Sequence, residues 1–220
     1  MRTTVVTSIF LSRKPEMYSQ KYLQAMSATL DKTEASLGTE TASLQQALER
    51  TVEILKEVQS INGTQFFLGN GASAAFAEHM ALDWTKNGGV RSLNPSSAVL
   101  LTALANDISF QDSFAMFIDR YARPGDAVVT ISSSGNSGNI LKAIEAARKM
   151  QCKVITLSGL KPDNASRKSG DVNFYVPART YGIVECAHQV LLHMMIDSFM
   201  GIEEWEKTGY QNMNISEFRL

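Results

Sequence analysis

The stretch from Val128 to Ser137 constrains the fold of this chain more than any other. It begins with a β-branched run, Val-Val-Thr-Ile, which has the composition of a buried parallel strand. It continues as Ser-Ser-Ser-Gly-Asn-Ser, and apolar residues then recur with helical spacing from residue 139 to residue 149. A hydroxyl-rich loop is therefore expected between the carboxyl end of a strand and the amino end of a helix.

Such a loop favours the binding of an anion. Backbone N–H groups at the start of a helix are unpaired and attract anions. The hydroxyls of Ser132, Ser133, Ser134 and Ser137 add neutral donors that can surround a phosphate. The loop has no Gly-Lys-Ser/Thr sequence, so it is not a Walker-type nucleotide loop. A Ser/Asn-rich turn with helix caps is the simpler alternative, and we interpret the stretch as a phosphate-binding loop.

Length and composition narrow the class of protein. The 220 residues are 44% hydrophobic, which suits one α/β domain with or without a helical extension. A net charge of −1 gives no indication of electrostatic nucleic-acid binding, and no apolar run is long enough for a membrane span. The apolar run over residues 5–11 is short for a signal peptide, so we expect a docked N-terminal segment. Cys152 and Cys186 form no C-x-x-C motif and indicate a reducing, cytoplasmic compartment.

Two amphipathic helices are predicted ahead of the sheet, over residues 15–36 and 41–61. Gly38 ends the first helix and Asn62-Gly63 ends the second. No strand is expected between them, so residues 1–62 are predicted to form an N-terminal segment with a helical hairpin. That hairpin either covers the sheet or forms an oligomer interface.

Residues 63–202 are predicted to form a doubly wound, five-stranded parallel sheet, followed by a C-terminal tail over residues 203–220. The strands are expected at residues 65–68, 90–93, 128–131, 153–157 and 173–176, with helices between them. Five such strands fit the flavodoxin-like order 2-1-3-4-5. The loop over residues 69–73 would then face the serine loop at the topological switch point, where ligands bind. We expect the tail to dock on a neighbouring surface.

Two groups of polar residues lie on predicted helices. His79 and Asp83 have an i, i+4 spacing that places both side chains on one helical face. Such a pair can ligate a divalent metal or act as an acid and a base, although many His–Asp pairs are merely solvated.

The second group is Glu185, Gln189 and His193, each four residues apart on an otherwise apolar helix. A polar row in an apolar helix needs buried partners, unless it is a solvent-facing stripe. Glu185 and His193 are separated by ~12 Å along the axis, so one ion would have to lie between them. His188 is off this row and is expected to be structural or to lie at a subunit boundary.

The serine loop after a hydrophobic strand resembles the phosphate loop of the sugar isomerase (SIS) domain family. Over roughly residues 15–200 the chain resembles the phosphoheptose isomerase branch of that family. Its Gly-Asn-Gly-Gly-Ser motif corresponds to residues 69–73, and its His with an acid four positions later corresponds to His79 and Asp83. Its Gly-Asn-Asp corresponds to residues 105–107, and its late Gln and final His correspond to Glu185 and His193.

The resemblance implies an aldose–ketose isomerase that converts sedoheptulose 7-phosphate to D-glycero-D-manno-heptose 7-phosphate through an enediol. It also implies a cytoplasmic homotetramer, with the helical hairpin in the interface, that makes a precursor for lipopolysaccharide or capsule. The catalytic residues would be Asp83 and His193. One zinc ion per subunit would be held by His79, Asp83, Glu185 and His193. The substrate would contact Asn70, Gly71, Ala72, Ser73, Asp83, Asn106, Asp107, Ser132, Ser133, Ser134, Ser137 and Glu185.

The chain also departs from the family pattern. Asp83 replaces a Glu, Glu185 replaces a Gln, and residues 182–184 replace an Asp-Arg pair. The family's Ser-His-Cys-Asp reads Ser-Ala-Ala-Phe at residues 73–76, which removes polar groups near the tail of the substrate. These changes favour two alternatives, a non-catalytic phosphosugar-binding or regulatory adaptor protein and an isomerase of another sugar phosphate. Retention of the two histidines and of Asp83 favours the enzyme.

Overall fold

A computed structural model describes residues 15–202, with side chains from Met17 onward. In this part of the chain, seven strands form one sheet in the order β2-β1-β7-β6-β5-β3-β4. The parallel strands are β3 (Thr64–Gly69), β4 (Arg91–Leu93), β5 (Ala127–Ser132), β6 (Lys153–Gly159) and β7 (Val172–Val176). Taken alone, they confirm the predicted flavodoxin-like order.

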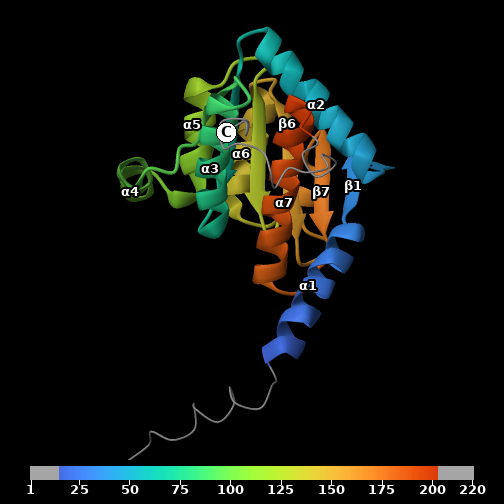
Figure 1. Ribbon diagram of the computed structural model, residues 1–220. Helices are drawn as coiled ribbons and strands as arrows, with labels where there is room; N and C mark the ends of the chain where they lie inside the picture. The colour runs from blue at the N-terminus through green and yellow to red at the C-terminus, as the bar shows by residue number, and fades with distance from the viewer. Residues whose placement is uncertain (1–14, 203–220) are drawn as a thin grey trace, which may run out of the picture.

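Helices cover both faces of the sheet (Figure 1). They are α1 (Pro15–Asp31), α2 (Leu44–Ser60), α3 (Ala72–Lys86), α4 (Ala98–Asp107), α5 (Ser113–Tyr121), α6 (Gly138–Lys149) and α7 (Tyr181–Met200), with short 3-10 turns at Phe110–Asp112 and Ser166–Lys168. One core lies between the sheet and α2, α3 and α7, and the other lies between the sheet and α5 and α6. Strand alternation sends Val129 to the first core and Val128 to the second, which is why the β5 run is apolar on both faces.

The prediction of two helices without a strand between them is wrong. A β-hairpin of β1 (Glu34–Leu37) and β2 (Glu40–Ala42) separates α1 from α2, and β1 pairs antiparallel with β7. Gly38 makes the tight turn with φ +56°, and Ala35 is buried against the edge of the sheet. Residues 34–37 therefore pair with the edge of β7 and do not continue the helix. Asn173 on β7 stabilises this pairing by donating hydrogen bonds to Ser36 Oγ and to the Gly38 carbonyl.

The expected N-terminal segment and the whole of the predicted C-terminal tail, residues 203–220, lie outside the described residues. The predicted boundary near residue 62 falls between α2 and β3, yet the hairpin on its N-terminal side belongs to the same sheet. In Figure 1, α1 runs beyond the end of the sheet beside the start of α7. Between residues 15 and 202, no helix combines the length and the apolar character that crossing a membrane requires.

His188 is completely buried between α7 and the sheet. Its Nε2–H donates a 3.1 Å hydrogen bond to the carbonyl of Ser158 on β6, which ties the helix to the strand. Burial lowers the pKa of His188 from 6.5 to about 4, although the Ser158 hydrogen bond opposes part of that shift. The structural role expected for this residue agrees with its place in the core.

The neutral imidazole of His188 predicts a stability that depends on pH. The unfolded chain protonates this residue below about pH 6.5, whereas the folded chain keeps it neutral until about pH 4. The free energy of unfolding should therefore fall as the pH decreases across that window. In His188→Asn, the fall measured by urea unfolding between about pH 7 and about pH 4.5 should be smaller by roughly 2 kcal/mol. An equal fall in the variant and the wild type would contradict this assignment.

Candidate active site

The serine loop leaves the carboxyl end of β5 and returns at once into α6. Gly135 lies at φ +64°, and a Cβ built there would come within 1.9 Å of the Asn164 side chain, so only glycine fits. The hydroxyl of Ser132 accepts a hydrogen bond from the Gly135 N–H, and that of Ser134 accepts one from the Asn136 N–H. Two of the serine side chains therefore hold the loop in shape.

Ser133 differs from these two serines. Its side chain is buried, and its Oγ has no hydrogen-bond partner within the described chain. A buried hydroxyl without a partner is costly unless a ligand or water completes its hydrogen bonds. Because the loop stands at the start of α6, that ligand would also face the unpaired N–H groups of the helix.

The loop forms one wall of a cavity of about 310 Å³ at the carboxyl end of the parallel strands. The other walls are the loop after β3 and the first two turns of α7. The lining residues are Asn70, Gly71, Ala72, Ser73, Ile131, Ser132, Ser133, Ser134, Ser137, Tyr181 and Glu185. The structure thus brings together nine of the twelve residues expected to contact the substrate. Within residues 15–202 no lysine or arginine lines this cavity, so the donors that these residues offer to an anion are neutral.

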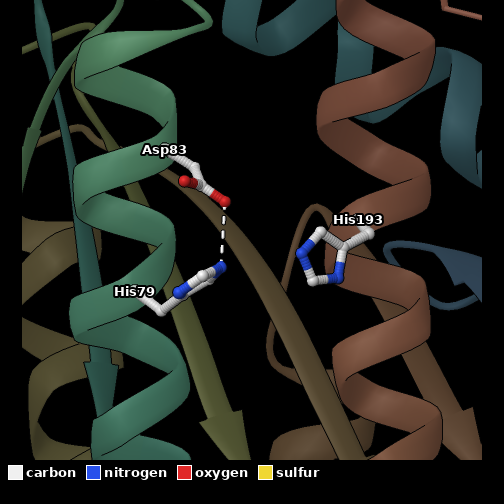
Figure 2. Close-up of side chains that lie close together, drawn as sticks. All are labelled: His79, Asp83 and His193. Carbon is white, nitrogen blue, oxygen red and sulfur yellow. Dashed lines mark ion pairs between the residues drawn. The ribbon is translucent and has the colours of Figure 1, made fainter. Parts of the chain in front are cut away.

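A second group of side chains lies where α3 and α7 run side by side (Figure 2). His79 Nε2 and Asp83 Oδ2 are 3.0 Å apart, and the rings of His79 and His193 have centroids 5.7 Å apart. One potential ligand atom from each of these three residues lies within 4.8 Å of the other two. Figure 2 shows the His193 ring directed across the gap toward the pair on α3.

The orientation of His193 is fixed by its own helix. Its Nδ1 lies 3.0 Å from the carbonyl of Gln189 and 3.2 Å from the side-chain Nε2 of the same residue, so Gln189 holds the ring in place. In the tautomer that donates from Nδ1 to that carbonyl, Nε2 is unprotonated and available as a ligand or a base. Two imidazoles and one carboxylate are a donor set that zinc takes in catalytic sites, where a further position stays open. The cluster of His79, Asp83 and His193 therefore fits a divalent metal ion.

Glu185, the predicted fourth ligand, is not part of this cluster. It lies two turns before His193 on α7, about 12 Å along the helix axis, and lines the cavity instead. Asp83 likewise belongs to the cluster and not to the cavity lining.

The structure does not bring Asn106 and Asp107 to the cavity. Both are exposed at the end of α4, where the Asn106 amide donates a 2.8 Å hydrogen bond to Asp107 Oδ1. Figure 1 places α4 at the side of the molecule, away from the start of α7.

Sequence reasoning missed two lining residues, Tyr181 and Ile131. The polar row on the predicted helix starts at Glu185, but α7 itself starts four residues earlier, at Tyr181. The signal was present in Thr180, whose hydroxyl caps the helix by accepting from the Ile183 N–H at 3.4 Å. An earlier start adds an aromatic side chain to the cavity.

Comparisons with known proteins agree with this geometry. The family model described as SIS domain matches residues 21–159. The phosphoheptose isomerase of Trichlorobacter lovleyi is 33% identical over 188 residues, which cover 83% of this chain and 92% of that protein. That of Helicobacter pylori is 32% identical over 161 residues, covering 70% and 83%. The solved structure of phosphoheptose isomerase GmhA from Neisseria gonorrhoeae is 26% identical, has a TM-score of 0.73, and aligns over 84% of this chain and 99% of its own. The chain therefore belongs to the SIS domain family and, within it, to the phosphoheptose isomerases.

Proposed function

We propose that this protein is an aldose–ketose isomerase that converts sedoheptulose 7-phosphate to D-glycero-D-manno-heptose 7-phosphate. The observation that carries the proposal is that α3 and α7 each connect the cavity to the metal-competent cluster. Ser73 and Glu185 line the cavity near the starts of these helices, and Asp83 and His193 lie further along them. A substrate held by its phosphate in the cavity must be an extended chain to reach the cluster, which suits an open-chain heptose phosphate.

The phosphate would bind between the serine loop and the start of α6. The unpartnered Ser133 hydroxyl and the first N–H groups of α6 would donate to its oxygens. The carboxylate of Glu185, which shares the cavity, would repel the phosphate and accept hydrogen bonds from sugar hydroxyls. The phosphate therefore faces α6 and the sugar faces α7.

The isomerisation requires two proton transfers. Asp83 would take a proton from C1 of the ketose and return it to C2, and the electrons would form and then break the C1–C2 double bond of the enediol. His193, in the form that carries a proton on Nε2, would give that proton to O2 as the enediol forms and would take one back from O1 as the aldehyde forms. Asp83 Oδ2 is paired with His79, which leaves Oδ1 for the proton on carbon.

The same three residues would hold a zinc ion when the His193 Nε2 is unprotonated, and Glu185, the fourth ligand expected from the sequence, lines the cavity instead. When bound, zinc would polarise the sugar oxygens and stabilise negative charge on them. The shorter Asp83 retains the contact with His79 that the family's longer acid would be expected to make, because both residues lie on one face of α3.

A non-catalytic phosphosugar-binding or adaptor role is the second candidate, and isomerisation of another sugar phosphate is the third. The exposure of Asn106 and Asp107 favours the second, since these expected substrate contacts lie outside the cavity. Binding without turnover would identify it.

We also propose a cytoplasmic homotetramer with residues 15–60 in the interface. Large apolar side chains are exposed on α1, where Leu23 is 68% exposed and Tyr18 57%. Others flank the cluster, with Leu82 61% and Met194 37% exposed. Apolar surface of this kind is typical of a subunit contact.

Cys152 and Cys186 are free thiols, as expected in a reducing compartment.

Replacing Ser133 by alanine tests the phosphate site. The change removes the hydroxyl that has no partner within the described chain, so KM for sedoheptulose 7-phosphate should rise at least tenfold, about 1.4 kcal/mol. Steady-state kinetics measures this, with Ser60→Ala, an exposed serine on α2, as the control. An unchanged KM in Ser133→Ala would contradict the assignment of the serine loop as the phosphate-binding site.

The metal and the base are tested together. We expect about one zinc per purified chain, and a fall in turnover on the order of 10²–10⁴-fold in Asp83→Asn with circular dichroism unchanged. A panel of five-, six- and seven-carbon sugar phosphates, assayed with and without added zinc, identifies the substrate. A metal-free protein whose Asp83→Asn variant keeps full turnover would shift the assignment to the binding role.

The oligomeric state is tested by light scattering. The exposed Leu23 should be covered by a neighbouring subunit, so Leu23→Glu should reduce the tetramer to smaller species at micromolar concentration. Lys21→Glu, an exposed change nearby on α1, is the matched control. A monomeric wild-type protein would contradict the proposal.

A further inference from the structure

Two asparagines from different parts of the chain form a closed pair beside the cavity. The side-chain amide of Asn70 donates to Asn139 Oδ1, and that of Asn139 donates to Asn70 Oδ1, both at 2.9 Å. Asn70 follows β3 and lines the cavity, whereas Asn139 lies in the first turn of α6 and is only 2% exposed. The pair therefore joins the two walls that meet at the topological switch point.

The geometry of this pair can be met only by two amides. Each side chain supplies one donor and one acceptor to the other, so a carboxylate, a hydroxyl or an apolar group at either position leaves a polar atom without its partner. A buried donor or acceptor that is left without its partner destabilises the folded chain. Across the described residues, no other side-chain hydrogen bond connects the loop at residues 70–73 with the serine loop or the start of α6.

The two walls need such a link because they diverge. β3 and β5 are adjacent strands, but α3 packs on one face of the sheet and α6 on the other. The backbone hydrogen bonds of the strands end at Gly69 and Ile131, which leaves the loops beyond them without a shared ladder. The amide pair crosses the gap between the two walls just beyond the end of this ladder.

We propose that Asn139 is a positioning residue that holds the β3 loop at a fixed distance from the phosphate-binding helix, so that a sugar anchored by its phosphate meets the opposite wall in register. This inference rests on the proposed phosphosugar function. It also revises the role of Asn70. The side-chain carbonyl oxygen of Asn70 and one of its two side-chain N–H bonds are already hydrogen-bonded to Asn139. Asn70 retains one side-chain N–H for a substrate.

The test separates two ligands that depend on the pair differently. Inorganic phosphate needs only the serine loop and α6, whereas sedoheptulose 7-phosphate needs both walls. In Asn139→Ala, titration calorimetry should find phosphate affinity within about twofold of the wild type and sugar phosphate affinity at least tenfold weaker, about 1.4 kcal/mol. Asn70→Ala, at the partly exposed partner, should show the same split and covers the case in which Asn139→Ala fails to fold.

A double-mutant cycle and a packing control complete the experiment. Each single change breaks the same two hydrogen bonds. The double alanine variant should therefore bind the sugar phosphate, within about twofold, as well as the single variant that binds it less tightly. Ile140→Val, a core change at the next position of α6, should lower stability and leave the ratio of the two affinities unchanged.

Each outcome bears on the proposal. Equal losses for the two ligands would show that the pair only stabilises α6, and additive losses in the cycle would show that the asparagines act independently; either result overturns it. Turnover of sedoheptulose 7-phosphate is measured on the same samples. A protein that shows the predicted split but no turnover would keep the positioning role and lose the isomerase assignment, whereas a wild type that binds neither ligand would overturn both.

Discussion

The site depends on one constraint, the complete burial of β5 between β3 and β6. All six residues of β5 are buried, and its backbone pairs with a parallel strand on each side. The strand therefore cannot shift, and the serine loop leaves the sheet at a fixed point. The loop is also held from the β6 side, where Ser166 N–H donates to the Gly135 carbonyl and Ala165 N–H donates to the Asn136 side chain. A neutral anion site needs this rigidity, because hydroxyl and N–H donors act only at short range.

The cavity beside the serine loop and the cluster of His79, Asp83 and His193 lie at different positions along the same two helices, α3 and α7. Among the described residues, the serine-loop wall of the cavity offers neutral donors, whereas the cluster further along α3 and α7 contains two imidazoles and a carboxylate. The apolar core beneath both helices, which includes Met80, Trp84 and Leu191, fixes the rotation of each helix and so the direction of its polar face. The His193 ring gains a second constraint from the Gln189 carbonyl.

Sequence patterns predicted those parts of the fold that rest on local periodicity and on strand order. The five parallel strands, the serine loop and the i, i+4 pair on α3 follow from residues close together in the chain. The β1–β2 hairpin could not be found in this way, because Ala35 becomes a strand residue only when the edge of β7 is present to pair with it. Tertiary pairing decided that segment over its helical pattern. Asn106 and Asp107 were placed by resemblance alone, and no local pattern says which way the end of α4 faces.

The Asn70–Asn139 pair shows the same limit at the level of a single contact. Its members are separated by 69 positions, and each reads as an ordinary polar residue near a helix start. Only the parallel pairing of β3 with β5 brings the two loops together, and only the divergence of α3 and α6 onto opposite faces makes a direct link necessary. A strand order can therefore indicate where a ligand lies, but the width of the site depends on side chains that cross the switch point. In this chain that width is set by two neutral amides, which adds no charge to a cavity that already contains the carboxylate of Glu185.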